Sequence, residues 1–321
     1  MIVWADSSYL LYLYGFAFMK KDVTYKVAGH LFSIEAEDES FLWPLMEECY
    51  GPFIADDSEE RCFSLSVCGL AELPSDAVSV YSNREDVEEG FIALDVFNSP
   101  EGHHFLLTQP SSSEPNGRLT VSLDYSQAKV SLHGTRMEQW LTFTAAVDFC
   151  YLLSTAFRDT VLTHSSAVLY KGRAYMFLGR SGTGKSTHSR MWLNALEDVV
   201  LMNDDHPVVR IRPDGQPVLY GSPWSGKTHC YKNIEAPLGG VIRIARAQHN
   251  KARRLSPIQA YASLMTSCSG MTWVKELADG KDRTLQAIVS RTPCWVMECL
   301  PDEDAAKVCS EAVTTVWEGK I

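Results

Sequence analysis

The sequence predicts a two-domain protein of mixed α/β (α+β) class, with a mostly β domain over residues 1–134 and an α/β core over residues 135–321. The first part consists of short aromatic and β-branched runs separated by turn residues. From Met137 to Phe157 the apolar residues recur at helical spacing. A strand, a glycine-rich loop and a helix then follow one another over Arg173–Glu197. A chain of 321 residues is long enough to build two cores.

The N-terminal domain is predicted from its strands. The stretch Tyr9–Phe18 is also interpreted as a strand, because it follows Asp6 rather than a basic region and so does not resemble a secretory signal. Asn116-Gly117, at the end of a Ser- and Pro-rich loop, is typical of a hairpin turn. The other predicted strands are Thr24–Val27, Phe63–Val67, Val78–Tyr81, Phe105–Thr108, Arg118–Leu123 and Lys129–Leu132.

Charge and hydropathy limit the kinds of partner that are expected, and the cysteine content indicates the cellular compartment. The net charge is -11, with -15 in residues 1–134 and +4 in residues 135–321, which argues against general nucleic-acid binding and allows a polyanionic ligand in the second half. No window approaches the roughly 18 apolar residues that a membrane span needs, so no membrane partner is expected. The nine cysteines are an odd number without a Cys-x-x-Cys pair, which favours reduced thiols and a cytoplasmic location. No structural metal is implied.

The segment Gly179–Ser186 has the residues that a phosphate-binding loop requires. Its glycines let successive backbone N–H groups turn toward phosphate oxygens, and the helix predicted over Thr187–Glu197 offers its positive end to an anion. Lys185 would reach the β- and γ-phosphates of a nucleoside triphosphate, and the hydroxyl of Ser186 would ligate Mg²⁺.

A second segment, Gly221–Thr228, fits the same eight-residue template. Pro223 removes one N–H group from the cradle, Trp224 crowds it, and Pro237 leaves little room for a following helix. We therefore expect the nucleotide loop at the first match. The second match is expected to be a turn, and whether it lines the same site is left open.

Two adjacent acids follow the next apolar run. Val199–Met202 ends in Asn203-Asp204-Asp205, about 18 residues beyond Lys185. Beside a phosphate loop, one acid can hold Mg²⁺ while the other accepts a proton from an attacking hydroxyl. The alternative is a surface turn that only caps the strand.

His164 and a group of basic residues are further candidates. A lone histidine before a strand is usually structural, but it could carry a proton or contact a phosphate. The basic residues could recognise a phosphate or an acidic substrate, although a solvated strand edge is the favoured interpretation. They are Arg243, Arg246, Lys251, Arg253 and Arg254.

From Thr163 to Glu298, this order of elements resembles the HPr kinase/phosphorylase-like P-loop family, whose kinase core is similar to that of phosphoenolpyruvate carboxykinase. In that family the histidine lies near the catalytic centre, the loop binds ATP, and the aspartates serve as base and metal ligand. The resemblance therefore implies ATP and Mg²⁺ as cofactors. It implies catalytic roles for Asp204, Lys185 and His164, metal ligation by Ser186 and Asp205, and nucleotide binding by Gly179, Arg180, Ser181, Gly182, Thr183, Gly184, Lys185, Ser186 and Thr187.

The resemblance is to a subgroup of that family. Tyr220–Lys227 and Ala236–Leu238 resemble HPr-kinase-like proteins found with uncharacterised and peptide-modifying bacterial proteins. True HPr kinases carry an acidic, Arg-Gly-containing signature at the corresponding place, whereas no acid stands between Tyr220 and Asn233 here. This difference argues against the reverse, phosphorylase reaction and against HPr as the target.

The leading functional expectation is an ATP- and Mg²⁺-dependent kinase that transfers the γ-phosphate to a hydroxyl group. The resemblance favours Ser or Thr of a protein or peptide as acceptor, and a small molecule remains open. One alternative is a non-catalytic nucleotide-binding regulatory protein whose acidic β domain engages a partner. Another is carboxykinase chemistry on a small keto acid, although carboxykinases are considerably longer. Adenine is preferred to guanine because of the resemblance and because no Asn-Lys-x-Asp follows the loop.

Overall fold

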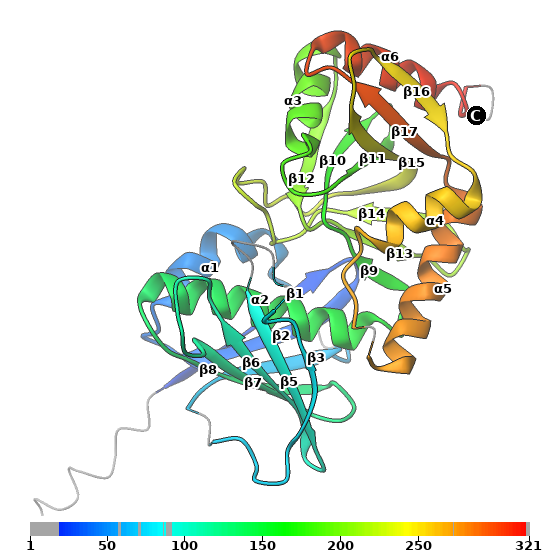
Figure 1. Ribbon diagram of the computed structural model, residues 1–321. Coiled ribbons are helices and arrows are strands. Elements are labelled where there is room, and N and C mark those ends of the chain that lie inside the picture. The colour runs from blue at the N-terminus through cyan, green and yellow to red at the C-terminus, as the bar shows by residue number, and fades with distance from the viewer. Residues whose placement is uncertain are drawn as a thin grey trace, which may run out of the picture.

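The computed structural model describes residues 19–56, 59–69, 72–85, 87, 92–271 and 273–318. Within these residues the chain forms two mixed β-sheets and six α-helices, which confirms the mixed α/β class at that level. One sheet lies in each half of the molecule (Figure 1). The strand predicted over Tyr9–Phe18 lies outside the described residues.

The N-terminal sheet has eight strands. Parallel pairing joins β2 to β3 and β3 to β8, and the other neighbours are antiparallel. All six strands predicted within the described part of this half are present, but β2 and β5 were missed because polar residues such as Glu35 and Asp95 interrupt their apolar runs. In spatial order the strands are β1 (Lys20–Val27), β2 (His30–Glu37), β3 (Phe63–Val67), β8 (Gln127–Leu132), β7 (Gly117–Val121), β6 (Gly102–Thr108), β5 (Ala93–Ser99) and β4 (Val78–Ser82).

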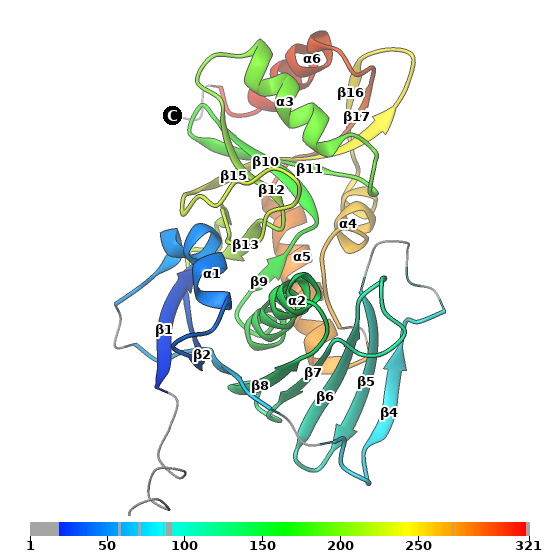
Figure 2. The ribbon, with the colours of Figure 1, turned by 90° about the vertical axis from the view of Figure 1, so that its left-hand side faces the viewer.

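Two helices, α1 (Leu42–Tyr50) and α2 (Arg136–Thr155), pack on one face of this sheet; the single turn η2 (Gly51–Phe53) follows α1 (Figure 2). The helix α2 begins beside the boundary predicted near residue 135. Thr135 caps it, because its hydroxyl accepts the N–H of Glu138 while the Glu138 carboxylate accepts the N–H of Thr135. The buried side of α2 packs back into the core of the preceding sheet.

The second sheet has nine strands, and β15 is shared among three neighbours. Its first residues pair with β14, while its later residues lie parallel to β11 and β17. The order is β12 (Val200–Asp205), β10 (Ser165–Tyr170), β11 (Arg173–Leu178), β15 (Glu235–Arg246), β14 (Pro217–Tyr220), β13 (Val208–Ile211) and β9 (Thr160–Leu162), with β17 (Cys294–Cys299) on β15 and β16 (Lys251–Arg254) on β17.

Helices cover both faces of this second sheet. The helices α3 (Lys185–Ala195) and α6 (Glu303–Thr314) pack on one face, and α4 (Pro257–Met265) and α5 (Lys275–Arg291) pack on the other (Figures 1 and 2). The central strands β10 and β11 are therefore buried on both sides, which explains their almost continuous apolar sequence.

A common core joins the two halves of the chain. Trp224, in the second half, donates its indole N–H to the hydroxyl of Tyr50 at 3.0 Å and packs edge-on against Tyr151 of α2. The same cluster of buried residues extends from the first sheet to Leu162 of β9 and Val208 of β13. Side chains from α2 are thus placed next to the edge of the second sheet.

Two further findings concern the whole described chain. All nine cysteines are free thiols, and eight of them are buried. No helix among the described residues has both the length and the apolar content needed to cross a bilayer.

Candidate functional site

The loop after β11 leads directly into α3. The helix begins at Lys185, two residues before the predicted start, so Lys185 and Ser186 belong to its first turn. Gly182 and Gly184 have φ angles of 71° and 114°, in the region that favours glycine because a side chain would be strained there. The nine residues predicted to bind a nucleotide, 179–187, therefore form one continuous strand-to-helix connection.

The side chain of Lys185 folds back over this loop. Its ammonium group donates to the carbonyl oxygen of Gly179 at 3.0 Å and lies 3.5 Å from that of Arg180. Burial lowers the pKa of Lys185, while the negative charges of Asp205 and Asp204 oppose that effect. A half-buried cation is thus held at the loop, within electrostatic range of both acids.

The two acids lie at the same sheet edge as the loop. Both β11 and β12 are antiparallel to β10, so β11 and β12 run in the same direction and their carboxyl ends meet at one edge. The ladder with β10 continues through Asp204 and Asp205, which pair with Ser166 and Ser165. The acids are therefore the last residues of the strand rather than a turn that follows it.

Because successive residues of a strand point to opposite faces, the two carboxylates face different surroundings. Asp204 shares the α3 face with Ser166, whose hydroxyl lies 2.5 Å from that of Ser189, one turn beyond Ser186. Asp204 is 8% exposed, and its Oδ1 has no hydrogen-bond partner among the described residues. An unpartnered buried carboxylate oxygen is costly unless a cation approaches it.

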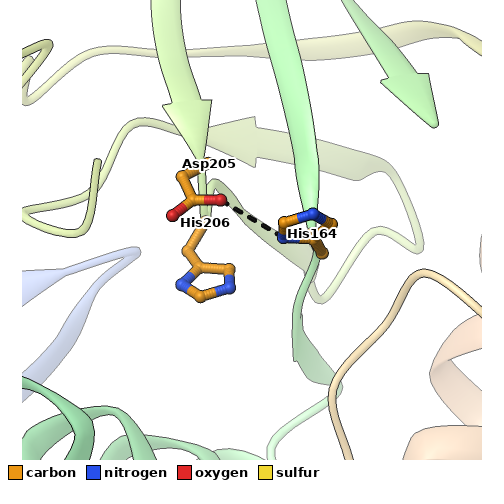
Figure 3. A group of neighbouring side chains, drawn as sticks. All are labelled: His164, Asp205 and His206. Carbon is orange, nitrogen blue, oxygen red and sulfur yellow. Dashed lines mark ion pairs between the residues drawn. The ribbon is translucent and has the colours of Figure 1, made fainter. Parts of the chain in front are cut away.

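Asp205 lies on the other side, with two histidines (Figure 3). Its Oδ1 is 3.2 Å from Nδ1 of His164, and ligand atoms of His164, Asp205 and His206 all lie within 4.8 Å of one another. Burial alone would raise the pKa of Asp205, but the hydrogen bond from His164 and the charges of His206 and Lys185 outweigh burial and lower it.

His206 and its partner Asp148 were not predicted from the sequence. Nδ1 of His206 lies 3.4 Å from a carboxylate oxygen of Asp148 on α2. Burial disfavours the charged imidazole, but Asp148 and Asp205 outweigh it and raise the pKa of His206. The only sequence signal was that His206 follows the paired acids. No pattern could link Asp148 to them, because packing of α2 against the second half brings it there.

The second template match occupies a different position. Gly221–Thr228 is irregular, and β15 rather than a helix follows it. The amide of Asn203 donates to the carbonyl oxygens of Ser222 and Trp224, and Ser225 forms a bridge with Asp205. A Cβ atom at Gly226 would lie 3.3 Å from the Asp205 carboxylate. The segment therefore packs against the end of β12 and holds the backbone that carries the paired acids.

Two cavities adjoin the loop, one at each end. The first, of about 380 Å³, lies beside Thr183 and Thr187 and continues between Met191 and Ile244. The second, of about 460 Å³, is lined by His164, Gly179, Arg180, Ser181, Arg243, Thr266 and Ser267.

The five basic residues singled out from the sequence do not lie together in the structure. Arg243 lines the second cavity, and Arg246 lines the first and donates to the carbonyl oxygen of Gly182. Lys251, Arg253 and Arg254 lie on β16, which pairs only with β17 among the described strands. The strand-edge interpretation therefore describes only these last three residues.

Comparisons with known proteins assign no family to this chain. No model of a known protein family matches the sequence, and no curated protein matches it either.

Proposed function

We propose that this protein is a Mg²⁺-dependent kinase of the HPr-kinase-like P-loop type, which transfers the γ-phosphate of ATP to a hydroxyl acceptor. The observation that carries the proposal is the meeting of a glycine loop, one lysine and two differently placed carboxylates at one sheet edge. Phosphoryl transfer requires this combination of positioned donors, positive charge and a proton acceptor.

The loop fits a triphosphate at its helix end. Backbone N–H groups around Gly182–Ser186 and the N-terminus of α3 favour the phosphates, and Lys185 can exchange its carbonyl partners for phosphate oxygens. The first cavity, between Met191 and Ile244, offers an apolar slot for the nucleobase.

The residues present also fit Mg²⁺. Asp204 supplies a buried oxygen that has no hydrogen-bond partner in the described part of the chain, on the face that carries the first turn of α3 with Ser186. Bound there, the cation would neutralise charge on the β- and γ-phosphates. In this proposal Asp204 and Ser186 are the metal ligands, whereas the resemblance implies Ser186 and Asp205.

The proton of the acceptor hydroxyl then passes to the opposite carboxylate. His164, the hydrogen-bond partner of Asp205, lines the second cavity, where an acceptor can enter. Asp148 orients His206, whose ring lies within 4.8 Å of a carboxylate oxygen of Asp205, so the base has an imidazole group near it in addition to His164. In this proposal Asp205 is the base that accepts the proton, in place of Asp204, and His164 orients Asp205.

A paired-lysine experiment tests the nucleotide site. Lys185→Ala and Lys227→Ala change the same position of the two template matches, and ATP affinity in the presence of Mg²⁺ is measured by titration calorimetry. We expect roughly a 10-fold or greater loss for Lys185→Ala, because a charged hydrogen bond is lost, and no change for Lys227→Ala. Unchanged affinity in Lys185→Ala would exclude the first loop as the nucleotide site, and an equal loss in Lys227→Ala would contradict its assignment to the first loop alone.

Turnover separates a kinase from a regulatory nucleotide-binding protein. The kinase proposal expects slow ATP hydrolysis by the wild-type protein, with phosphate released to water in the absence of an acceptor. Asp205→Asn should reduce the rate while leaving ATP affinity nearly unchanged. A protein that binds ATP but shows no hydrolysis above the Asp205→Asn background would instead be a non-catalytic binder. Turnover that required oxaloacetate would indicate carboxykinase chemistry.

A further inference from the structure

We propose that the second cavity is the acceptor site and that it selects an acceptor whose hydroxyl lies close to a carboxylate group. This inference rests on the proposed function, since it names the class of substrate for the same phosphate loop. A small hydroxy acid and a serine at the carboxyl terminus of a peptide share this chemistry.

The position of the cavity follows from the loop. The first cavity adjoins the helix end of the loop at Thr183 and Thr187, whereas the second adjoins its strand end at Gly179, Arg180 and Ser181. A nucleotide with its base in the first cavity extends its phosphates along the loop toward the second. His164, which contacts the proposed base Asp205, also lines the second cavity.

The ionisable side chains that line the cavity are all basic. Among the described residues its lining contains two guanidinium groups, one imidazole and three hydroxyl groups, and no carboxylate. Neither Arg180 nor Arg243 forms an ion pair with an acid among the described residues, although the whole chain carries a net charge of -11. Other arginines do find acids, as Arg84 does with Asp95. Unpaired guanidinium groups facing a cavity are suited to bind an oxyanion.

The sheet fixes the backbone position of Arg243. Arg243 lies in the second half of β15, paired with Leu178 at the end of β11 and with Val296 of β17. Two other lining residues are joined by the N–H of His164, which donates to the carbonyl oxygen of Ser267 at 2.6 Å. Arg243 is therefore anchored by two strand ladders beside the first residues of the loop.

A carboxylate is favoured over a phosphate as the recognised anion. The acceptor must approach the γ-phosphate closely, and a singly charged group is repelled less than a doubly charged one. A cavity of about 460 Å³ can hold a small hydroxy acid or the terminal residue of a peptide. Recognition of a carboxylate by two guanidinium groups would also place the neighbouring hydroxyl in a fixed position.

The transfer step is balanced by groups already named. The acceptor hydroxyl oxygen forms a bond to the γ-phosphorus while the bond from that phosphorus to the β–γ bridging oxygen breaks. The hydroxyl proton goes to the carboxylate of Asp205, and ADP leaves with the electron pair of the broken bond.

The test compares matched charged and neutral acceptors on the full-length protein with Mg²⁺. One pair is D-glycerate and glycerol, and the other is acetyl-Gly-Gly-Ser as free acid and as C-terminal amide. Binding is measured by calorimetry with ADP present, and phosphate transfer from ATP by mass spectrometry. We expect the charged member of at least one pair to bind roughly 10-fold or more tightly than its neutral partner and to be phosphorylated. The pair that discriminates identifies a small molecule or a peptide terminus as the source.

Arginine variants connect this preference to the cavity. Arg243→Gln should reduce the preference for the charged member while ATP affinity stays within about two-fold of wild type. Arg180→Gln, in the phosphate loop itself, should also reduce that preference. Arg190→Gln, an exposed position on α3 that lines neither cavity, is the matched control and should change nothing.

Two results would overturn the inference. One is that neither pair discriminates, including the case in which no probe binds. The other is that Arg243→Gln lowers ATP affinity as strongly as Lys185→Ala, which would assign Arg243 to the nucleotide phosphates. Both results differ from a failure of the kinase proposal itself, in which the wild-type protein would bind no ATP.

Discussion

Replacement of Asp204 by Asn should have opposite effects on stability with and without Mg²⁺. In the absence of the cation, Oδ1 of Asp204 is buried without a hydrogen-bond partner among the described residues. An unsatisfied buried polar group costs about 1–3 kcal/mol, more when charged, and the nearby charge of Lys185 offsets part of that cost. We therefore expect Asp204→Asn to raise the free energy of unfolding by about 1 kcal/mol in EDTA, or the Tm by about 2–4 °C.

Saturation with Mg²⁺ should reverse this order. A cation present at 100 times its dissociation constant stabilises the folded wild-type protein by about 2.7 kcal/mol, and the amide variant should gain little. The assay is chemical denaturation, followed by intrinsic tryptophan fluorescence, across a Mg²⁺ titration. The control is Asp205→Asn, which loses the ion pair with His164 at 3.2 Å and should be less stable than wild type even in EDTA.

The reasoning about Asp204 has two points of failure. If Asp204→Asn is less stable than wild type in EDTA, the buried oxygen is not a cost. If Mg²⁺ stabilises the variant as much as the wild-type protein, Asp204 does not hold the cation, and the metal would be assigned to Asp205 as the resemblance implies.

Three further predictions concern the supporting structure. Trp224→Ala should lower the free energy of unfolding by about 3–5 kcal/mol, as measured by urea denaturation. Trp224→Phe should lower it by about 1–2 kcal/mol, because the hydrogen bond to Tyr50 is lost. ATP affinity that is unchanged in Trp224→Phe would exclude a phosphate-binding role for the segment that contains Trp224. Burial lowers the pKa of His188 to about 4, so between pH 6.5 and 4 only the unfolded chain gains a proton at this residue. The free energy of unfolding should therefore fall over that range by up to about 1.4 kcal/mol per pH unit. A His188→Gln variant with the same pH slope would contradict this prediction. His164, Asp205 and His206 offer two imidazole nitrogens and a carboxylate oxygen within 4.8 Å of one another, a donor set that suits Mn²⁺ better than Mg²⁺. Mn²⁺ should therefore bind to the protein without nucleotide, as measured by electron paramagnetic resonance. His206→Gln should lose that binding.

The sequence alone located the elements whose signal is local. Turn chemistry and alternation identified most strands of the first sheet, and the helical spacing after Met137 identified α2. The connection between β11 and α3 was located because its glycines, Lys185 and Ser186 are contiguous, and Pro237 correctly indicated that no helix follows the second match. Such features depend on neighbouring residues, which interact in any tertiary context.

Only the tertiary structure decided what each side chain of the site faces. The strand ladder continues through Asp204 and Asp205 and directs them to opposite faces, a distinction invisible in two identical adjacent letters. Asp148 reaches His206 because α2 packs between the two sheets, and Arg243 lines the same cavity as Arg180 because β15 runs beside β11. These contacts join residues far apart along the chain, and they depend on sheet order and helix packing, for which a single sequence carries no local signal.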